Sequence, residues 1–234
     1  MEETTLQKCS GIAAFLVGLT SIAFGLLFLF AVPQAQKGPA PDALVSYATT
    51  PAPVEVAVVL VIVGSLSALV AVVGMYRLLR EQAPGWALLS LIVGSAFTIL
   101  TALDATYTAF LFPWLSHLYA TGDPALKAGS VLSWNAPSPI NPYDFVEFGL
   151  SSLWLLLTGA LIVRATSFSH VVGYLALLAG MGQLALFVST LTGTLPLILG
   201  IGVPGAVVVG PLFWILVGFT FWRRAGKPLV ELTA

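Results

Sequence analysis

The sequence predicts an all-α fold, a polytopic transmembrane helix bundle with six spans, a single domain and both termini in the cytoplasm. The first observation is composition, because 58% of the 234 residues are hydrophobic and only 8% are charged, whereas an ordinary globular chain is roughly a quarter charged. The second is that apolar runs of about twenty residues recur along the chain, which indicates membrane helices and not the ten-residue alternation of a membrane barrel.

The apolar runs place the spans at about 11–32, 54–79, 85–112, 143–162, 171–191 and 195–222. Two long loops separate them, at 33–53 and 113–142. The first loop is rich in proline and alanine, so we expect an extended chain. The second is rich in aromatic residues, which favours a lid lying over the helix ends at the membrane interface.

Within the first span, Gly11, Gly18 and Gly25 repeat every seven residues. Such a face lets the backbone of a neighbouring helix approach closely. The last span is interrupted by prolines and glycines. We expect Pro204 in the first turn of a helix that runs to Trp222, with 194–203 as a short bent or re-entrant piece.

The third span carries the acid around which the bundle is predicted to be organised, Asp104. At about 100° per residue, small and polar residues share one face of this helix with it: Ser90, Gly94, Thr98, Thr101 and Thr108. Leucine and isoleucine cover much of the remainder, so this polar stripe should face other helices or a wet cavity. An ionised carboxylate in hydrocarbon costs several kcal/mol, so Asp104 requires a partner or a proton.

The distribution of basic residues orients the chain. With an even number of spans both termini lie on one side, and on that side fall Lys8, Arg77, Arg80, Arg164, Arg223, Arg224 and Lys227. Lys37 and Lys127 fall on the other side. Because basic residues are retained in the cytoplasm, we expect the first side to be cytoplasmic and both long loops to lie outside.

The predicted ligand-binding residues gather at the outer side of the membrane: Asp104, Thr101, Thr108, Tyr107, Glu147, Tyr143 and Glu55. If the third and fourth spans are neighbours, Asp104 and Glu147 come within reach of each other, with Asp144 nearby. No basic residue lies in the outer half of any span to pair with them. The acids are therefore protonated and bonded to hydroxyls, or bind a cation or amine, or line a water-filled vestibule. A purely structural role, with Asp104 bonded to neighbouring threonine, tyrosine or backbone groups, is the alternative.

Catalytic and metal sites are not predicted. The serines of Gly149–Gly159 have no histidine at the same depth to act as a base. His117 and His170 are expected on opposite sides of the membrane, and Cys9 is the single cysteine, so the spacing of metal ligands is missing. No motif indicates a cofactor, and a net charge of −1 with scattered basic residues gives no support for nucleic-acid binding.

Three stretches resemble a family: VGMYRLLREQAPGWALLSLIVG, LLTGALIVRATSFSHVVGYLALLAG and PLFWILVGF. They are similar to a bacterial six-span integral membrane family described only as a domain of unknown function. The usual proline before the fifth span is replaced here by Ser167–Ser169. The resemblance implies six spans and the cytoplasmic membrane of a bacterium, and it implies no catalytic residues.

Two functions follow as hypotheses. The first is a non-enzymatic membrane protein, either an accessory subunit or a binder of a lipid or small apolar ligand through an outer pocket around Asp104. Its expected partners are membrane lipids and other membrane subunits. The alternative is a secondary carrier or proton-coupled permease that uses Asp104 and Glu147.

Overall fold

The computed structural model describes residues 3–194 and 204–225, and within these ranges every regular element is helical. Its eight α-helices are α1 (Glu3–Leu26), α2 (Ala40–Thr49), α3 (Ala52–Leu79), α4 (Pro84–Thr121), α5 (Pro124–Asn135), α6 (Ser151–Arg164), α7 (His170–Thr192) and α9 (Gly210–Ala225). Two 3-10 segments, η2 (Gln34–Lys37) and η3 (Pro142–Asp144), lie between them. Three π-helical segments extend α1, α6 and α9: η1 (Leu27–Ala31), η4 (Phe145–Leu150) and η6 (Gly205–Val209). The all-α fold class is therefore confirmed.

Six helical stretches are long and apolar enough to cross a bilayer: Thr4–Ala31, Ala52–Leu79, Pro84–Thr121, Pro142–Arg164, His170–Thr192 and Val207–Ala225. They overlap the six predicted spans in order, so the chain has the architecture of a multi-pass membrane protein. Pro204 begins the helical turn that leads into the last of them, as expected. Of the bent piece predicted at 194–203, residues 195–203 lie outside the described residues.

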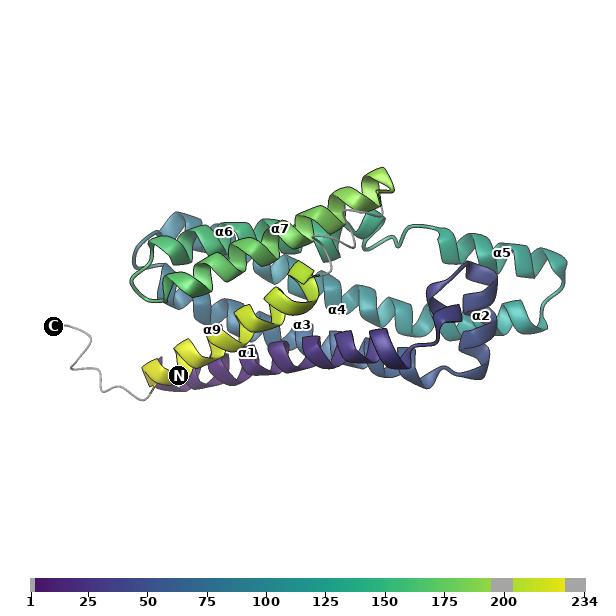
Figure 1. The fold of residues 1–234 in the computed structure, drawn as a ribbon, viewed down its shortest axis with the longest axis horizontal. Coiled ribbons are helices and arrows are strands. Elements are labelled where there is room, and N and C mark those ends of the chain that lie inside the picture. The colour runs from purple at the N-terminus through teal and green to yellow at the C-terminus, as the bar shows by residue number, and fades with distance from the viewer. Residues whose placement is uncertain (1–2, 195–203, 226–234) are drawn as a thin grey trace.

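The bundle is elongated, and its helices run along the long axis (Figure 1). α1 packs against α3 and α9, α3 packs against α4, and α6 packs against α7. Contacts of α4 with α6 and of α7 with α9 close the bundle. The start of α1 and the end of α9 lie at the same end of the molecule (Figure 1).

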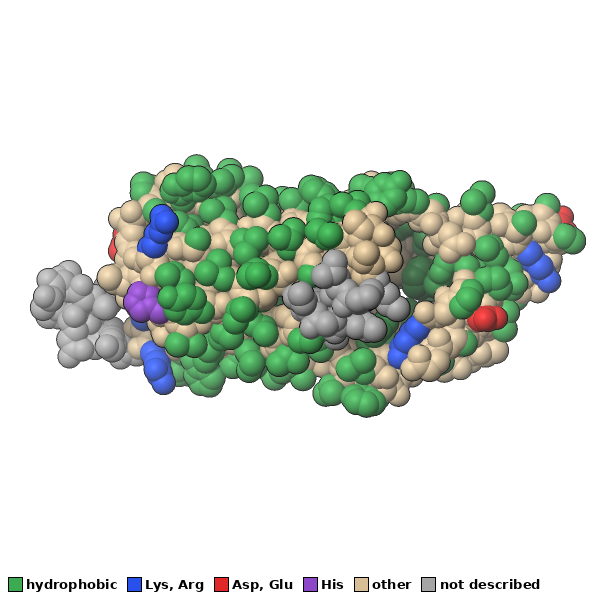
Figure 2. All heavy atoms as spheres, turned by 45° about the horizontal axis from the view of Figure 1, so that its top comes forward, with side chains coloured by type: hydrophobic (Ala, Val, Ile, Leu, Met, Phe, Trp, Pro, Cys, Tyr) green, Lys and Arg blue, Asp and Glu red, His purple; other side chains and the backbone are tan. Residues whose placement is uncertain are grey.

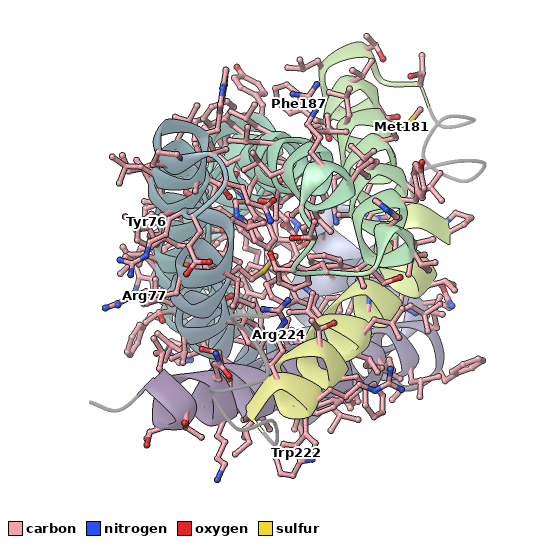
Figure 3. The ribbon with its side chains drawn as sticks, turned by 90° about the vertical axis from the view of Figure 1, so that its left-hand side faces the viewer. Tyr76, Arg77, Met181, Phe187, Trp222 and Arg224 are labelled. Atoms are coloured by element: carbon pink, nitrogen blue, oxygen red, sulfur yellow. The ribbon has the colours of Figure 1, made fainter. Side chains whose placement is uncertain are left out.

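That end, which we call the basic end, carries most of the positive charge. Arg77 and Arg164 lie in the last turns of α3 and α6, and Arg223 and Arg224 lie in the last turn of α9. Figure 2 shows lysine and arginine side chains with a histidine at this end of the molecule. Viewed from the basic end, Arg224 points in over the middle of the bundle, whereas Arg77 points outward (Figure 3). The opposite end is called the outer end below.

The glycine repeat of α1 packs against α9, as the prediction of a close helix contact requires. A Cβ atom at Gly11 would lie 3.2 Å from Cβ of Phe221, and one at Gly18 would lie 2.7 Å from Cγ1 of Ile215. The face that was predicted to receive a neighbouring helix is thus occupied by a helix of the same chain.

Aromatic residues fill the centre of the bundle. Trp154 of α6 is fully buried and stacks on Trp214 of α9 with ring centroids 5.3 Å apart. Phe97 of α4 stacks on the Trp154 indole with centroids 6.3 Å apart, and the Phe213 ring meets Trp154 edge-on at 6.1 Å. These contacts join α4, α6 and α9, and they fix the depth at which the polar face of α4 sits.

Both predicted outer loops contain helices, which corrects the expectation of an extended chain for the first loop, 33–53. In the first loop the prolines lie at helix starts: Pro39 precedes α2, and Pro51 precedes α3. Proline is compatible with a helix start because the first N–H groups of a helix have no partner within it. Proline in this segment therefore begins helices instead of extending the chain.

In the second loop, α4 continues past Phe112 through Pro113 to Thr121, so the helix that carries the third span is longer than the predicted 85–112. Pro113 removes only one hydrogen bond of the helix interior. Contacts before and after Pro113 offset this loss. Phe112 stacks on Trp134 of α5 with ring centroids 4.3 Å apart, and the hydroxyl of Ser116 donates to the carbonyl of Leu44 in α2 at 2.6 Å. α2, α5 and the end of α4 thus form a small outer subdomain.

Candidate functional site

The polar stripe of α4 faces the protein, as predicted. Ser90 and Thr98 are buried, whereas Ile92 and Leu103 on the other faces are exposed. The Ser90 and Thr158 hydroxyl oxygens lie 2.7 Å apart and join α4 to α6 by a buried hydrogen bond. At Gly94 a Cβ atom would lie 2.5 Å from Nε1 of Trp154, so this position allows α6 to approach. The stripe leads from this contact to Asp104, which is half-buried.

The partner of Asp104 is Ser138, which precedes η3 on the connection from α5. Its hydroxyl donates to Oδ1 of Asp104 at 2.6 Å, a short distance typical of a hydrogen bond to a charged oxygen. The same Ser138 oxygen accepts from the backbone N–H groups of Ile140 and Asn141 at 3.2 and 3.3 Å. Through its bond to the Ser138 side chain, Asp104 therefore holds the connection between α5 and η3 against α4.

Asn141 fixes the next turn of the chain. It is only 5% exposed, and its Oδ1 accepts from the N–H groups of Val146 and Glu147 at 2.7 and 3.4 Å. Asn141 thereby satisfies two of the free N–H groups at the start of the fourth span.

Between Asn141 and this helix start, Tyr143 and Asp144 adopt left-handed backbone conformations with φ of 54° and 55°. Two consecutive non-glycine residues in this region cost of the order of 1–3 kcal/mol each. The turn places Asp144 near α7, where its Oδ2 accepts from the Thr190 hydroxyl at 3.3 Å. Contacts to α4 and α7 thus hold a strained turn in place.

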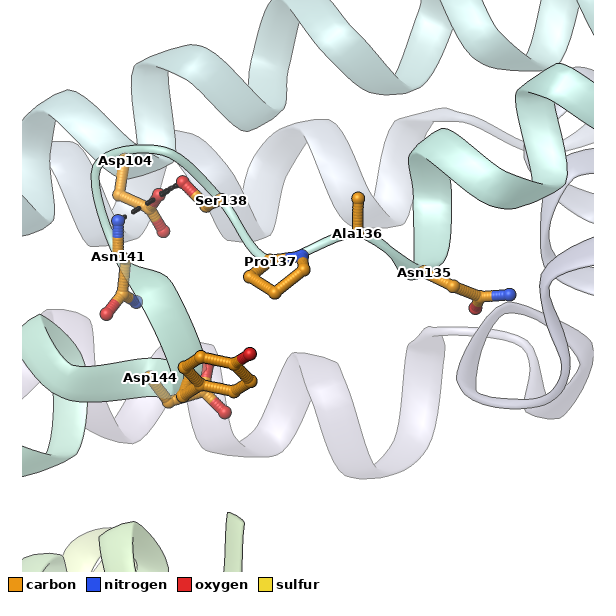
Figure 4. Close-up of a pocket in the computed structure, with 8 residues that line it drawn as sticks. Asp104, Asn135, Ala136, Pro137, Ser138, Asn141 and Asp144 are labelled. Atoms are coloured by element: carbon orange, nitrogen blue, oxygen red, sulfur yellow. Dashed lines mark hydrogen bonds between the residues drawn. The ribbon is translucent and has the colours of Figure 1, made fainter. Parts of the chain in front are cut away.

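These residues line an open pocket of about 300 Å³ at the outer end of the bundle (Figure 4). Its lining is Asp104, Asn135, Ala136, Pro137, Ser138, Asn141, Tyr143 and Asp144. Two carboxylates, two amides, a serine and a phenol contribute to it, and no lysine, arginine or histidine among the described residues lines it. Carboxylates that share a pocket without a cation repel each other unless one is protonated or a positive ligand is bound. The chemistry of the lining therefore suits a small polar cation or amine better than an apolar molecule.

The structure brings together only part of the predicted site. Tyr143 lines the pocket with Asp104, and Asp144 takes the place at the pocket that the sequence analysis gave to Glu147, whose side chain is exposed and lies outside the lining. Thr101 donates to the carbonyl of Phe97 in its own helix at 2.9 Å, and Tyr107 and Thr108 do not line the pocket.

Glu55 does not line the pocket and lies in the first turn of α3, next to the outer subdomain. Its Oε1 accepts a hydrogen bond from the phenol of Tyr47 at 3.5 Å. Burial, and next the negative charge of Glu55, raise the pKa of Tyr47 to about 12. This pair links α2 to the start of α3, so it has a structural role.

The sequence analysis did not identify three polar residues of the pocket, Asn135, Ser138 and Asn141. Asn141 carried a local signal, since Asn followed by Pro marks a turn and Asn is a common helix cap. Ser138 carried none, because its partner lies 34 residues away in the sequence.

Among the described residues, no three His, Cys, Asp or Glu side chains lie close enough to hold a metal ion.

All three π-helical segments of the described chain lie toward the outer end, because each extends a transmembrane helix on the side opposite the basic end. One of them, η4, contacts α4 and α7 directly after the strained turn. π-helical turns are rare and occur frequently at functional sites. Their position agrees with the pocket being the functional end of the bundle.

Comparison of the chain with protein-family models, with curated proteins and with solved structures finds no match. The resemblance to a bacterial six-span family therefore stays a prediction.

Proposed function

We propose that this chain is a non-enzymatic integral membrane protein that binds a small, positively charged polar ligand in the pocket around Asp104. The observation that carries the proposal is the lining itself: Asp104 and Asp144 share a pocket of about 300 Å³ whose lining supplies no cation. The sequence analysis favoured a small apolar ligand. Such a ligand would cover these carboxylates and the amides of Asn135 and Asn141 without offering them a hydrogen bond or an opposite charge.

The size and chemistry of the pocket suggest the class of ligand. A volume near 300 Å³ is at the lower end for small-molecule sites. The carboxylates would accept hydrogen bonds from an ammonium group, and the Tyr143 ring, which is 61% exposed at the rim, would offer its face to a methylated ammonium. We therefore propose a small amine or quaternary ammonium ion, either free or as the headgroup of a lipid.

The proposed location is the cytoplasmic membrane, with the basic end in the cytoplasm and the pocket open to the outside. Arginines at the ends of α3, α6 and α9 support this orientation, whereas the outer end carries Lys37 and Lys127. Positive residues are retained on the cytoplasmic side of membrane proteins.

The proposal is tested by ligand-dependent thermal stability of the purified protein in detergent. We expect at least one of methylammonium, ethanolamine, choline and putrescine, at millimolar concentration, to raise the Tm, because a ligand that binds only the folded state stabilises it. Asp104→Asn and Asp144→Asn should each abolish the increase. Asp42→Asn serves as the matched control, since Asp42 is an exposed acid of α2 outside the pocket. An increase that survives in Asp104→Asn, or none with any of the four amines, contradicts the proposal.

A second candidate function is that of an accessory subunit. Phe110 and Trp114 lie one turn apart on α4 and are 76% and 58% exposed, beyond the roughly twenty residues that a helix needs to span a bilayer. Leu132 of α5, outside the candidate spans, is 74% exposed. If these side chains contact another subunit, the protein extracted from its native membrane should migrate as a larger complex, and Trp114→Ala should release it. A monodisperse monomer after mild extraction would contradict this function.

A further inference from the structure

A second cavity lies at the basic end of the bundle, between the start of α7 and the last turns of α9. Its volume is about 450 Å³. Ser169, Val171 and Val172 line it on the α7 side, and Leu216, Phe219, Thr220 and Arg223 line it on the α9 side. None of these residues belongs to the pocket around Asp104, so this groove is a separate feature.

The groove changes from polar to apolar along the bundle axis. On α9 the lining residues recur with helical spacing and form a single face, so Phe219 lies about 6 Å and Leu216 about 10 Å deeper than Arg223 at 1.5 Å per residue. On α7, Ser169 caps the helix and the two valines follow in its first turn. One end of the groove is therefore charged and the other is hydrocarbon, and its axis follows the transmembrane helices.

The polar end is suited to an anion. Arg223 is exposed, and no aspartate or glutamate of the described residues lines the groove. The 23-residue helix α7 begins here, and the N-terminus of a helix carries partial positive charge and unpaired N–H groups. Ser169 Oγ accepts from the N–H of Val171 at 3.3 Å, which leaves its own hydrogen available to donate. A guanidinium, a hydroxyl and a helix N-terminus are the groups that bind phosphate.

The apolar end is suited to an acyl chain. Val171 and Phe219 are 58% and 49% exposed, and both belong to stretches long and apolar enough to span the membrane. A cavity with these walls opens to lipid. Trp222, next to Arg223 and directed outward in Figure 3, has the position of an aromatic residue at the membrane interface.

We propose that this groove is a binding site for one anionic phospholipid, with the phosphate at Arg223 and the start of α7 and an acyl chain between Val172, Leu216 and Phe219. The groove matches such a lipid in both charge and polarity, because its cation lies at headgroup depth and its apolar α9 residues lie one to two helical turns deeper. Binding is independent of the ligand proposed for the pocket at the outer end.

Native mass spectrometry of the full-length protein with dioleoylphosphatidylglycerol tests this site, with dioleoylphosphatidylcholine as the zwitterionic reference. The protein should retain one phosphatidylglycerol more tightly than phosphatidylcholine. Arg223→Ala should weaken that binding about fivefold, the effect expected for one basic residue near a membrane surface. Val171→Trp, which fills the groove without changing charge, should weaken it as well. Both positions are exposed, so we expect the variants to fold, and size-exclusion chromatography of each variant is the check.

Arg77→Ala is the matched control, because Arg77 is an exposed arginine at the same end of the bundle but outside the groove. Its affinity for phosphatidylglycerol should stay within about twofold of the unsubstituted protein. Equal weakening by Arg77→Ala and Arg223→Ala would show general attraction of anionic lipid to the basic end and would overturn the proposal. Equal retention of the two lipids, or full binding by Val171→Trp, would also overturn it.

Discussion

The hydrogen bond between Ser138 and Asp104 is the contact on which the outer pocket depends, and a double-mutant cycle measures it. The variants are Asp104→Ala, Ser138→Ala and the double substitution. Each single variant removes the same 2.6 Å bond, and Ser138→Ala also removes the acceptor for the N–H groups of Ile140 and Asn141. The double variant loses the shared bond only once, so the single effects should not add.

The magnitude follows from the geometry. A hydrogen bond to a charged group contributes about 1.5–3 kcal/mol net, and the half-buried position of Asp104 favours the lower end. We expect a coupling energy of about 1.5 kcal/mol, which is roughly a twelvefold change in the unfolding equilibrium. Ser138→Ala should be the more destabilising single change, by about 1 kcal/mol, because two backbone donors lose their acceptor as well.

The assay is reversible unfolding in mixed micelles of increasing SDS content, followed by far-ultraviolet circular dichroism. Thr121→Ala provides the control, since Thr121 bonds only to the carbonyl of His117 at the exposed end of α4. Its effect should add to that of Ser138→Ala within about 0.3–0.5 kcal/mol. If Asp104→Ala and Ser138→Ala add to the same accuracy, the bond does not stabilise the protein and our account of the pocket is wrong.

Two further predictions test the packing and the outer subdomain. Gly173→Ala should destabilise the protein by about 1–3 kcal/mol in the same SDS titration, because its Cβ would lie 2.8 Å from the backbone nitrogen of Val163. Gly129→Ala in α5, where an added Cβ would meet no described atom outside its own stretch of helix within 4 Å, should be neutral or stabilising, and equal losses for the two would refute the packing argument. The Tyr47 phenol should titrate about two pH units above its ordinary value of 10.0, at about 12. A raised pKa favours the neutral phenol in the folded state, so its contribution to stability is complete below pH 10 and is lost as pH rises through 12. Ultraviolet absorbance of tyrosinate, compared with Tyr47→Phe, checks this, and a Tyr47 that ionises near pH 10 would contradict it.

The transmembrane part of the fold could be predicted because its signals are local. Apolar length sets the spans, and the seven-residue glycine repeat of α1 identifies a helix contact, although it does not say that the contacting helix is α9. The angular position of Ser90 and Thr98 correctly indicates the buried face of α4. These patterns depend on bilayer thickness and helix geometry alone.

The outer end could not be predicted in the same way, since it depends on contacts between distant residues. α4 persists past Pro113 because Phe112 and Ser116 pack against α5 and α2, and neither partner is visible in the local sequence. Asp104 was correctly identified as needing a partner, but its bond to Ser138 requires the strained turn at Tyr143 and Asp144 to bring the connection back. The placement of Asp144 and not Glu147 at the pocket follows from that turn.

α4 is 38 residues long, about 57 Å, and it is a single helix from the basic end to the outer subdomain. Asp104 lies about 25 Å before its outer end, near the level at which a helix of twenty residues would leave the hydrocarbon. Within the bundle this helix is held against α6 at Ser90, which bonds to Thr158, and at Gly94, which packs on Trp154 of α6. The projecting end of α4, which packs against α2 and α5, and the aspartate of the pocket therefore belong to one continuous helix.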